Sequence, residues 1–289
     1  ANSQLAENAP APEDRAALTA KYKELVQNGA AESENLDLQK QYLDAVLALG
    51  YYDLAAAVYE KQLQNTPHDP ALLRALGEAW MKVGPYGKEK AFVALQKSAA
   101  IAPDNTDTLI LLANLCHREG GYEQASQYYE KITAIDPDHV QARLGKAVLE
   151  VRSGNIKAAS EIMDQIGVAA QPYDIQTRIM LRKALMTFER TGGWFEDTAE
   201  NHAAYARLLY RAGRITDAVL AARRSVILNE SDYETWNFIA AMQLQVGNLE
   251  HAEQAYGHSL TAKPDQPEIE KQRRQIIDEL TRRNMNQKP

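Results

Sequence analysis

Histidine, cysteine and acidic side chains are the residues that bind metal ions or act in nucleophilic catalysis. Their spacing in this chain matches neither a metal site nor a catalytic site. The sequence has no HExxH, GxxxxGK[ST], GxGxxG or GxSxG motif. His251 and His258 lie two helical turns apart, but no third metal ligand accompanies them. The single cysteine, Cys116, excludes an internal disulfide and a cysteine-based zinc site. We therefore predict no catalytic residue, no metal site and no cofactor, and so a protein that is not an enzyme.

Six glycines recur along the chain and mark a repeated unit: Gly50, Gly84, Gly120, Gly154, Gly213 and Gly247. The histidines and the cysteine lie within this repeat. The spacing of the glycines is 34 to 36 residues, except for the 59 residues between the fourth and fifth. Such a period is typical of helix-turn-helix units that stack into a solenoid. Glycine suits the turn because a helix C-cap often needs a positive φ, and a later proline such as Pro137 separates one unit from the next.

Each side of Gly120 carries an apolar helical face: Leu109, Leu112, Ala113 and Cys116 before it, and Tyr122, Ala125 and Tyr129 after it. This arrangement predicts that Cys116 is a buried thiol and not a nucleophile. The sixth unit repeats the pattern with Trp236, Ile239, Ala240, Ala252, Tyr256 and Pro264, whereas the fourth and fifth units fit it less well. The pattern resembles the tetratricopeptide repeat over roughly residues 36 to 265. The resemblance implies an all-α, right-handed α-solenoid of about six helix pairs.

The expected organisation is a flexible leader (1–12), an N-terminal capping helix (13–29), repeats one to four (36–172), an inserted helix (173–193), repeats five and six (194–265), and a C-terminal capping helix and tail (266–289). The capping helices should bury Leu18, Tyr22, Leu25 and Val26 at one end, and Ile269, Ile276, Ile277 and Leu280 at the other. Self-association through either helix is the alternative.

The inserted helix should bury one apolar side, made of Ile175, Ile179, Leu181, Leu185 and Phe188, and end at Gly192 and Gly193. We expect it to interrupt the alternating stack between the fourth and fifth units. Its simpler interpretation is a spacer that fills its own groove. The alternative is that this helix, together with Trp194 and Phe195, presents an apolar surface to a partner.

The resemblance also implies that the first helix of each pair lines a concave groove. The candidate groove residues are Arg74, Glu78, Lys82, Asn114, Arg118, Arg152, Arg207, Tyr210, Arg211 and Asn237. Asn114 occupies the position at which many peptide-binding members of the family hold a peptide backbone. We hypothesise that the groove takes a peptide with acidic groups, and that Arg118, Arg152 and Arg211 are its charge partners. The alternative is that these cations only offset the dipoles of their helices.

The net charge of the chain and the composition of its leader limit the possible partners and the expected compartment. With 32 basic and 39 acidic residues the net charge is -7, which argues against a nucleic-acid partner, and no apolar run is long enough for membrane insertion. Ala1 is not an initiator methionine and the leader is rich in Ala, Pro and Glu, so we expect a periplasmic or membrane-anchored protein, tethered upstream, with the cytoplasm as the alternative.

The predicted function is a non-catalytic scaffold that binds a protein or peptide, as an assembly factor or adaptor of a bacterial envelope complex for pili, secretion, the outer membrane or cytochrome c maturation. The alternatives are a helical-repeat RNA-binding protein and an accessory domain of a larger enzyme.

Overall fold

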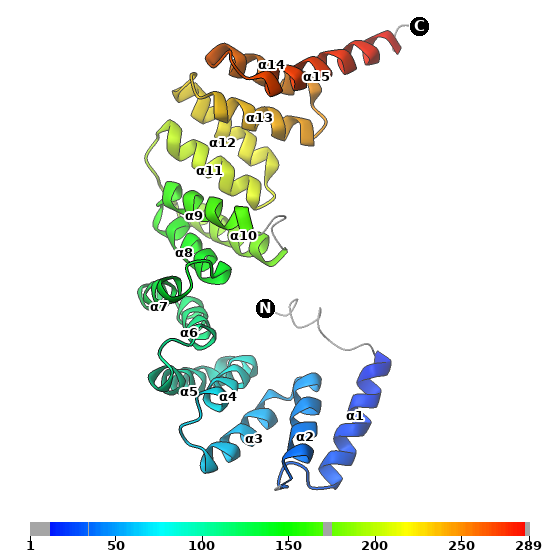
Figure 1. Cartoon of the computed structure of the whole chain (residues 1–289), viewed down its shortest axis with the longest axis vertical. Coiled ribbons are helices and arrows are strands. Elements are labelled where there is room, and N and C mark those ends of the chain that lie inside the picture. The colour runs from blue at the N-terminus through cyan, green and yellow to red at the C-terminus, as the bar shows by residue number, and fades with distance from the viewer. Residues whose placement is uncertain (1–11, 34, 170–174, 287–289) are drawn as a thin grey trace. The chain divides into compact units, whose positions relative to one another are not determined.

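A computed structural model describes residues 12–33, 35–169 and 175–286. These residues form fifteen α-helices and one 3-10 turn, with no strand among them (Figure 1). The chain divides into two compact units, Ala1–His139 and Val140–Pro289. The all-α prediction is thus confirmed. The leader lies outside the described residues except for Pro12, with which the first helix begins.

The first unit contains α1 (Pro12–Gln27), α2 (Leu36–Leu49), α3 (Tyr52–Asn65), α4 (Pro70–Val83), η1 (Pro85–Gly87), α5 (Lys88–Ile101), α6 (Thr106–Arg118) and α7 (Tyr122–Ile135). The second contains α8 (Val140–Ser153), α9 (Ile156–Ala169), α10 (Ile175–Arg190), α11 (Ala199–Arg211), α12 (Ile215–Leu228), α13 (Tyr233–Gln245), α14 (Leu249–Ala262) and α15 (Pro267–Asn286). Six antiparallel pairs result, which are α2–α3, α4–α5, α6–α7, α8–α9, α11–α12 and α13–α14.

Glycine ends the first helix of each pair, as the sequence predicts. All six repeat glycines have φ between 76° and 99°. This is the left-handed region, where a side chain would be strained. At Gly154 a methyl group would also meet a neighbour, because its Cβ would lie 2.7 Å from the carbonyl oxygen of Trp194. The same turn therefore ends a helix and supports a distant loop.

Small and hydroxyl side chains hold the helices of a pair together. In α4 a Cβ on Gly77 would lie 2.5 Å from Leu95 Cγ of α5, so the two helices are in close contact. Three fully buried serines of second helices each donate a hydrogen bond to the first residue of the paired helix: Ser98 to the Pro70 carbonyl at 2.8 Å, Ser225 to Ala199 at 2.8 Å, and Ser259 to Tyr233 at 3.2 Å. These bonds fix the start of α4, α11 and α13.

The inserted helix α10 packs on first helices and leaves the stack uninterrupted. It packs against α8 and also contacts α11, while α11 packs against α9 just as α13 packs against α12. The predicted interruption is therefore wrong, because α10 lies beside the stack. Its buried side contains Leu181, Leu185 and Phe188 as predicted, but Ile175 and Ile179 are 67% and 38% exposed. Those two predictions are wrong because α10 has a second apolar side.

The terminal helices each bury part of the predicted face. In α1, Leu25 is buried and Tyr22 packs against the rings of Tyr42 and Tyr51, with centroids 5.9 Å and 5.4 Å away. In α15, Ile276 is buried, and Ile269 and Leu280 pack on the same core. Val26 and Ile277 are exposed, so their predicted burial is wrong. Each follows a buried neighbour and lies about 100° further round its helix, on the side that the packing leaves uncovered.

Candidate protein-binding surfaces

The predicted groove residues of α4 already interact within the first unit. Arg74 Nη1 lies 2.8 Å from Glu78 Oε1, one helical turn away. Lys82 Nζ lies 5.2 Å from the centre of the Tyr52 ring, a cation–π contact with α3. Glu78 offsets the charge of Arg74, and the Tyr52 ring attracts the Lys82 ammonium without neutralising it, so both cations are already engaged within the unit.

Asn114 and Arg118 of α6 differ in their surroundings. Asn114 is half-buried and its Oδ1 accepts a 3.1 Å hydrogen bond from the Tyr129 hydroxyl of α7. Burial raises the pKa of Tyr129 to about 12, so the phenol remains a donor at neutral pH. Arg118 is exposed. Of the two, Arg118 is the better placed for a ligand, because Asn114 is occupied in joining the helices of its pair.

In the second unit, Arg211 is part of the helix packing. Its side chain is 13% exposed and forms an ion pair with Asp164, which joins α11 to α9. Arg152 is exposed and also interacts within the chain. The proposed role of Arg211 as a charge partner for a peptide is therefore not supported by its geometry. Its charge serves the contact between repeats four and five.

Three other predicted residues lie on α11 and α13. Arg207 is half-buried. Tyr210 is 37% exposed and meets Phe238 edge to face, with centroids 5.4 Å apart. Asn237 Nδ2 donates a 2.9 Å hydrogen bond to Gln266 Oε1. The structure thus brings α11 and α13 together at Tyr210, with Arg207 one turn earlier on α11.

The three tryptophans have different surroundings. Trp80 lies under Lys90, whose Nζ is 3.9 Å from the ring centre. Trp236 stacks on His258 at 4.4 Å and donates to the Glu230 carbonyl at 3.0 Å. Trp194 is 77% exposed and lines a cavity of about 560 Å³ beside the turn between α8 and α9. Tryptophan is enriched at protein interfaces, where its large ring supplies apolar contact area and its N–H a hydrogen bond.

The residue that follows Trp194 anchors the loop. Phe195 is half-buried, stacks on Phe188 of α10 at 6.4 Å, and contacts His202 and Tyr205 of α11, both at 5.2 Å. Gly193 permits this arrangement, since its Cβ would lie 2.4 Å from the Phe188 ring. Phe195 is therefore part of the packing, and the surface predicted for the pair is reduced to Trp194.

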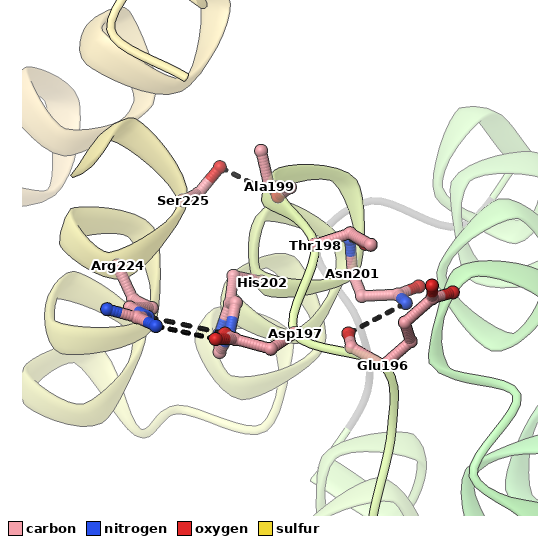
Figure 2. A network of polar contacts seen from close by, with 8 residues as sticks. All are labelled: Glu196, Asp197, Thr198, Ala199, Asn201, His202, Arg224 and Ser225. Carbon is pink, nitrogen blue, oxygen red and sulfur yellow. Dashed lines mark hydrogen bonds and ion pairs between the residues drawn. The ribbon is translucent and has the colours of Figure 1, made fainter. Parts of the chain in front are cut away.

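A polar network fixes the loop on its other side (Figure 2). Asp197 Oδ2 accepts a 2.5 Å hydrogen bond from Arg224 Nη2 of α12, and its Oδ1 lies 2.6 Å from His202 Nε2 of α11. The interaction with Arg224 first, and then that with His202, hold the pKa of Asp197 at about 2, below its ordinary value of 3.8. Asn201 Nδ2 also donates to the Glu196 carbonyl at 3.0 Å.

A second network links α10 to α11 and α12. Glu189 of α10 accepts hydrogen bonds of 2.7 Å and 2.8 Å from Arg214 Nη1, and another from the Tyr205 hydroxyl. Arg214 also donates a 2.7 Å hydrogen bond to Asp217. Burial, followed by the contact with Glu189, raises the pKa of Tyr205. These contacts fix the last turn of α10, from which the Trp194 loop continues.

Cys116 is buried, and burial raises the pKa of its thiol. The predicted buried thiol is confirmed. Within the described residues no group of three or more His, Cys, Asp or Glu side chains is placed to hold a metal ion, and none of their helices is long and apolar enough to cross a membrane.

Paired helices that stack through small residues define a helical-repeat solenoid. Two tetratricopeptide-repeat family models match the chain, one over residues 117–176 and the other over residues 204–267. The chain therefore contains tetratricopeptide repeats, as the resemblance implied. Such repeats generally mediate protein–protein interaction and are typical of scaffolds.

The chain is also similar to individual known proteins. The Arabidopsis thaliana protein "CTR9 homolog" is 33% identical over 159 residues, a match that covers 53% of this chain and 14% of that protein. A tetratricopeptide repeat protein from Parabacteroides merdae is 14% identical with a TM-score of 0.44, covering 89% of this chain and 99% of that one. The structure of the hetero-tetramer Cut9-Hcn1 has a TM-score of 0.39 at 16% identity, covering 91% of this chain and 55% of that one. The family assignment rests on the repeats themselves.

Proposed function

We propose that this protein is a non-catalytic scaffold that binds a protein partner through the Trp194 loop, residues 192–198 of the second unit. The observation that carries the proposal is a tryptophan side chain that is 77% exposed between two fixed points. Phe195 is held in an aromatic cluster, and Asp197 is held by Arg224 and His202.

This fixed backbone favours binding. Association costs the ordering of mobile side chains and loops, so a loop that is already held in place loses less entropy when a partner arrives. Tryptophan is also among the residues that contribute most to protein interfaces when they enter a pocket. A partner that covers Trp194 would also extend over the cavity beside it, where Lys157 and Glu161 supply polar contacts.

Acidic groups on the partner are a further part of the proposal. Of the predicted charge partners Arg118, Arg152 and Arg211, only Arg118 is exposed and forms no ion pair with another described residue, whereas Arg211 is engaged with Asp164 and Arg152 also interacts within the chain. Reversal of its charge, as Arg118→Glu, should weaken binding and reduce its dependence on salt. An affinity that is unchanged at low and high salt would remove the acidic partner from the proposal.

Affinity capture from extract of the source cells, followed by mass spectrometry, tests the main proposal. The full chain, Trp194→Ala and Tyr86→Ala serve as baits; Tyr86 is a matched control because it is 92% exposed and lies in the first unit. Proteins captured by the wild-type and Tyr86→Ala chains should be lost from Trp194→Ala. Capture of the same proteins by all three baits would refute the role of Trp194.

The compartment and pathway are proposed from the Ala/Pro/Glu-rich leader and the single cysteine. We place the protein in the periplasm or on the membrane facing it, as an adaptor of an envelope complex. Cell fractionation with an antibody to the chain should find it in the periplasmic or membrane fraction. Its recovery in the cytoplasmic fraction alone would contradict this.

A further inference from the structure

The outward side of α10 is apolar in the middle and basic at its edges. Ile175, Ile179 and Met186 are 67%, 38% and 54% exposed. At 100° per residue they fall within an arc of about 40°, and they extend over about 16 Å of helix. The buried side of α10, with Leu181 and Leu185, lies across the helix from them. This outward row of Ile175, Ile179 and Met186 is called here the α10 stripe.

Cations flank the stripe on both sides. On the helical wheel Arg178 and Arg182 lie on one side of it, and Lys183 and Arg190 on the other. All four are exposed, and none forms an ion pair with another described residue. The one acidic residue of α10, Glu189, is already bound to Arg214 at 2.7 Å. This surface is therefore locally positive in a chain whose net charge is -7.

We infer that the α10 stripe docks an amphipathic helix of a protein partner, one whose apolar residues are flanked by Asp or Glu. Apolar anchors that recur with the helical period match a helix packed along a helix better than an extended strand. Cations on both sides complement carboxylates on both edges of the incoming helix and fix its position along α10. Methionine also adapts readily to the side chains of a partner.

An anionic membrane and a second copy of this chain fit the stripe less well. Helices that lie in a membrane interface bury a wide apolar face, often with Trp or Phe. The exposed side of α10 has neither, and Arg182 lies next to the centre of the stripe. Nothing on this side of α10 is acidic apart from the engaged Glu189, so two stripes facing each other would repel. The inference rests on the proposed scaffold function and adds the partner's chemistry.

Fluorescence anisotropy with a labelled peptide tests the inference on the full chain. The probe is a stapled helical peptide with leucines at i, i+4, i+7 and i+11 and glutamates on both flanks. The comparison peptide has lysines in place of the glutamates. The variants are Ile179→Glu with Met186→Glu, and Arg182→Glu with Lys183→Glu. The matched control is Leu220→Glu with Ile227→Glu, two α12 residues that are 60% and 67% exposed. Circular dichroism melting shows whether each variant folds.

Binding of the acidic peptide should fall about tenfold or more in both α10 variants, remain in the α12 control, and weaken as salt rises. The lysine peptide should not bind. Peptide binding that the α10 variants leave unchanged would overturn the inference.

Vesicle binding and the oligomeric state test the two other occupants, an anionic membrane and a second copy of this chain. Binding to phosphatidylserine vesicles without binding to the peptide, or a dimer that the α10 variants dissociate, would likewise overturn the inference. The Trp194→Ala variant should bind the peptide normally. A failure of the acidic peptide to bind the wild-type chain would overturn this inference and leave the Trp194 proposal standing, to be judged by the capture experiment.

Discussion

Replacement of Gly154 by alanine should destabilise the second unit more than the same change at Gly247. Both glycines end a first helix, with φ of 81° and 78°. A non-glycine residue in this region costs about 1–2 kcal/mol, of which the loss of unfolded-state freedom returns about 0.4–1 kcal/mol. At Gly247 nothing lies within 4 Å of the added Cβ. We therefore expect that Gly247→Ala lowers the free energy of unfolding by about 1 kcal/mol.

Gly154→Ala has a second cost. The added Cβ would lie 2.7 Å from the Trp194 carbonyl oxygen, so the loop or the turn must move. Overpacking of this kind costs about 1–3 kcal/mol, which brings the expected loss to about 2–4 kcal/mol. Urea unfolding followed by circular dichroism measures both losses. Both glycines lie in the second compact unit, so the two variants are compared on the same unfolding transition.

Amide hydrogen exchange links this stability change to the loop. Exchange in residues 195–198 should become faster in Gly154→Ala and stay unchanged in Gly247→Ala, because only the first variant pushes against Trp194. Equal losses of stability for the two variants, or unchanged exchange in Gly154→Ala, would refute the contact between this turn and the loop.

Three further predictions follow from the contacts. The pKa of Asp197 is about 2 in the folded chain, below its ordinary value of 3.8. The ion pair by which Asp197 holds the loop should therefore be complete above about pH 4 and be lost as the pH falls toward 2. Amide hydrogen exchange of residues 195–198 should become faster over this range, and Asp197→Asn should abolish the pH dependence. Arg211→Glu places a second carboxylate beside Asp164 and should lower the free energy of unfolding by about 1–3 kcal/mol. The same change at the exposed Arg118 should alter the free energy of unfolding by less than about 0.5 kcal/mol. Similar urea midpoints for the two variants would contradict the ion pair between Arg211 and Asp164. Cys116 should react with a thiol reagent only after unfolding in urea, because burial raises the pKa of its thiol, and rapid reaction of the folded chain would argue against burial.

Local signals in the sequence predict most of the fold. The glycines of the repeat adopt positive φ because a helix end imposes that conformation whatever lies around it. Apolar spacing likewise identifies the buried faces of paired helices. One further local signal was present: Ser225 and Ser259 each lie 12 residues after the glycine of their unit, at a position where both are buried and bond to the paired helix.

The sequence does not predict contacts between segments that lie far apart in the chain. The pairing of Arg211 with Asp164 spans 47 residues, and no local pattern assigns Arg211 to it instead of to a ligand. Ile175 and Ile179 fit a helical period, but periodicity cannot decide which of two apolar sides of α10 faces α8. The network of Asp197, with His202 on α11 and Arg224 on α12, likewise requires the packing of those helices.

Photo-cross-linking at position 194 tests most directly whether the fixed loop presents Trp194 to a partner. Benzoylphenylalanine would replace Trp194 in the full chain, or Tyr86 as the exposed control, and irradiation would take place in the source cells. We predict a discrete cross-linked species from position 194 that position 86 does not give. No cross-linked protein at position 194, or the same products at both positions, would contradict the account.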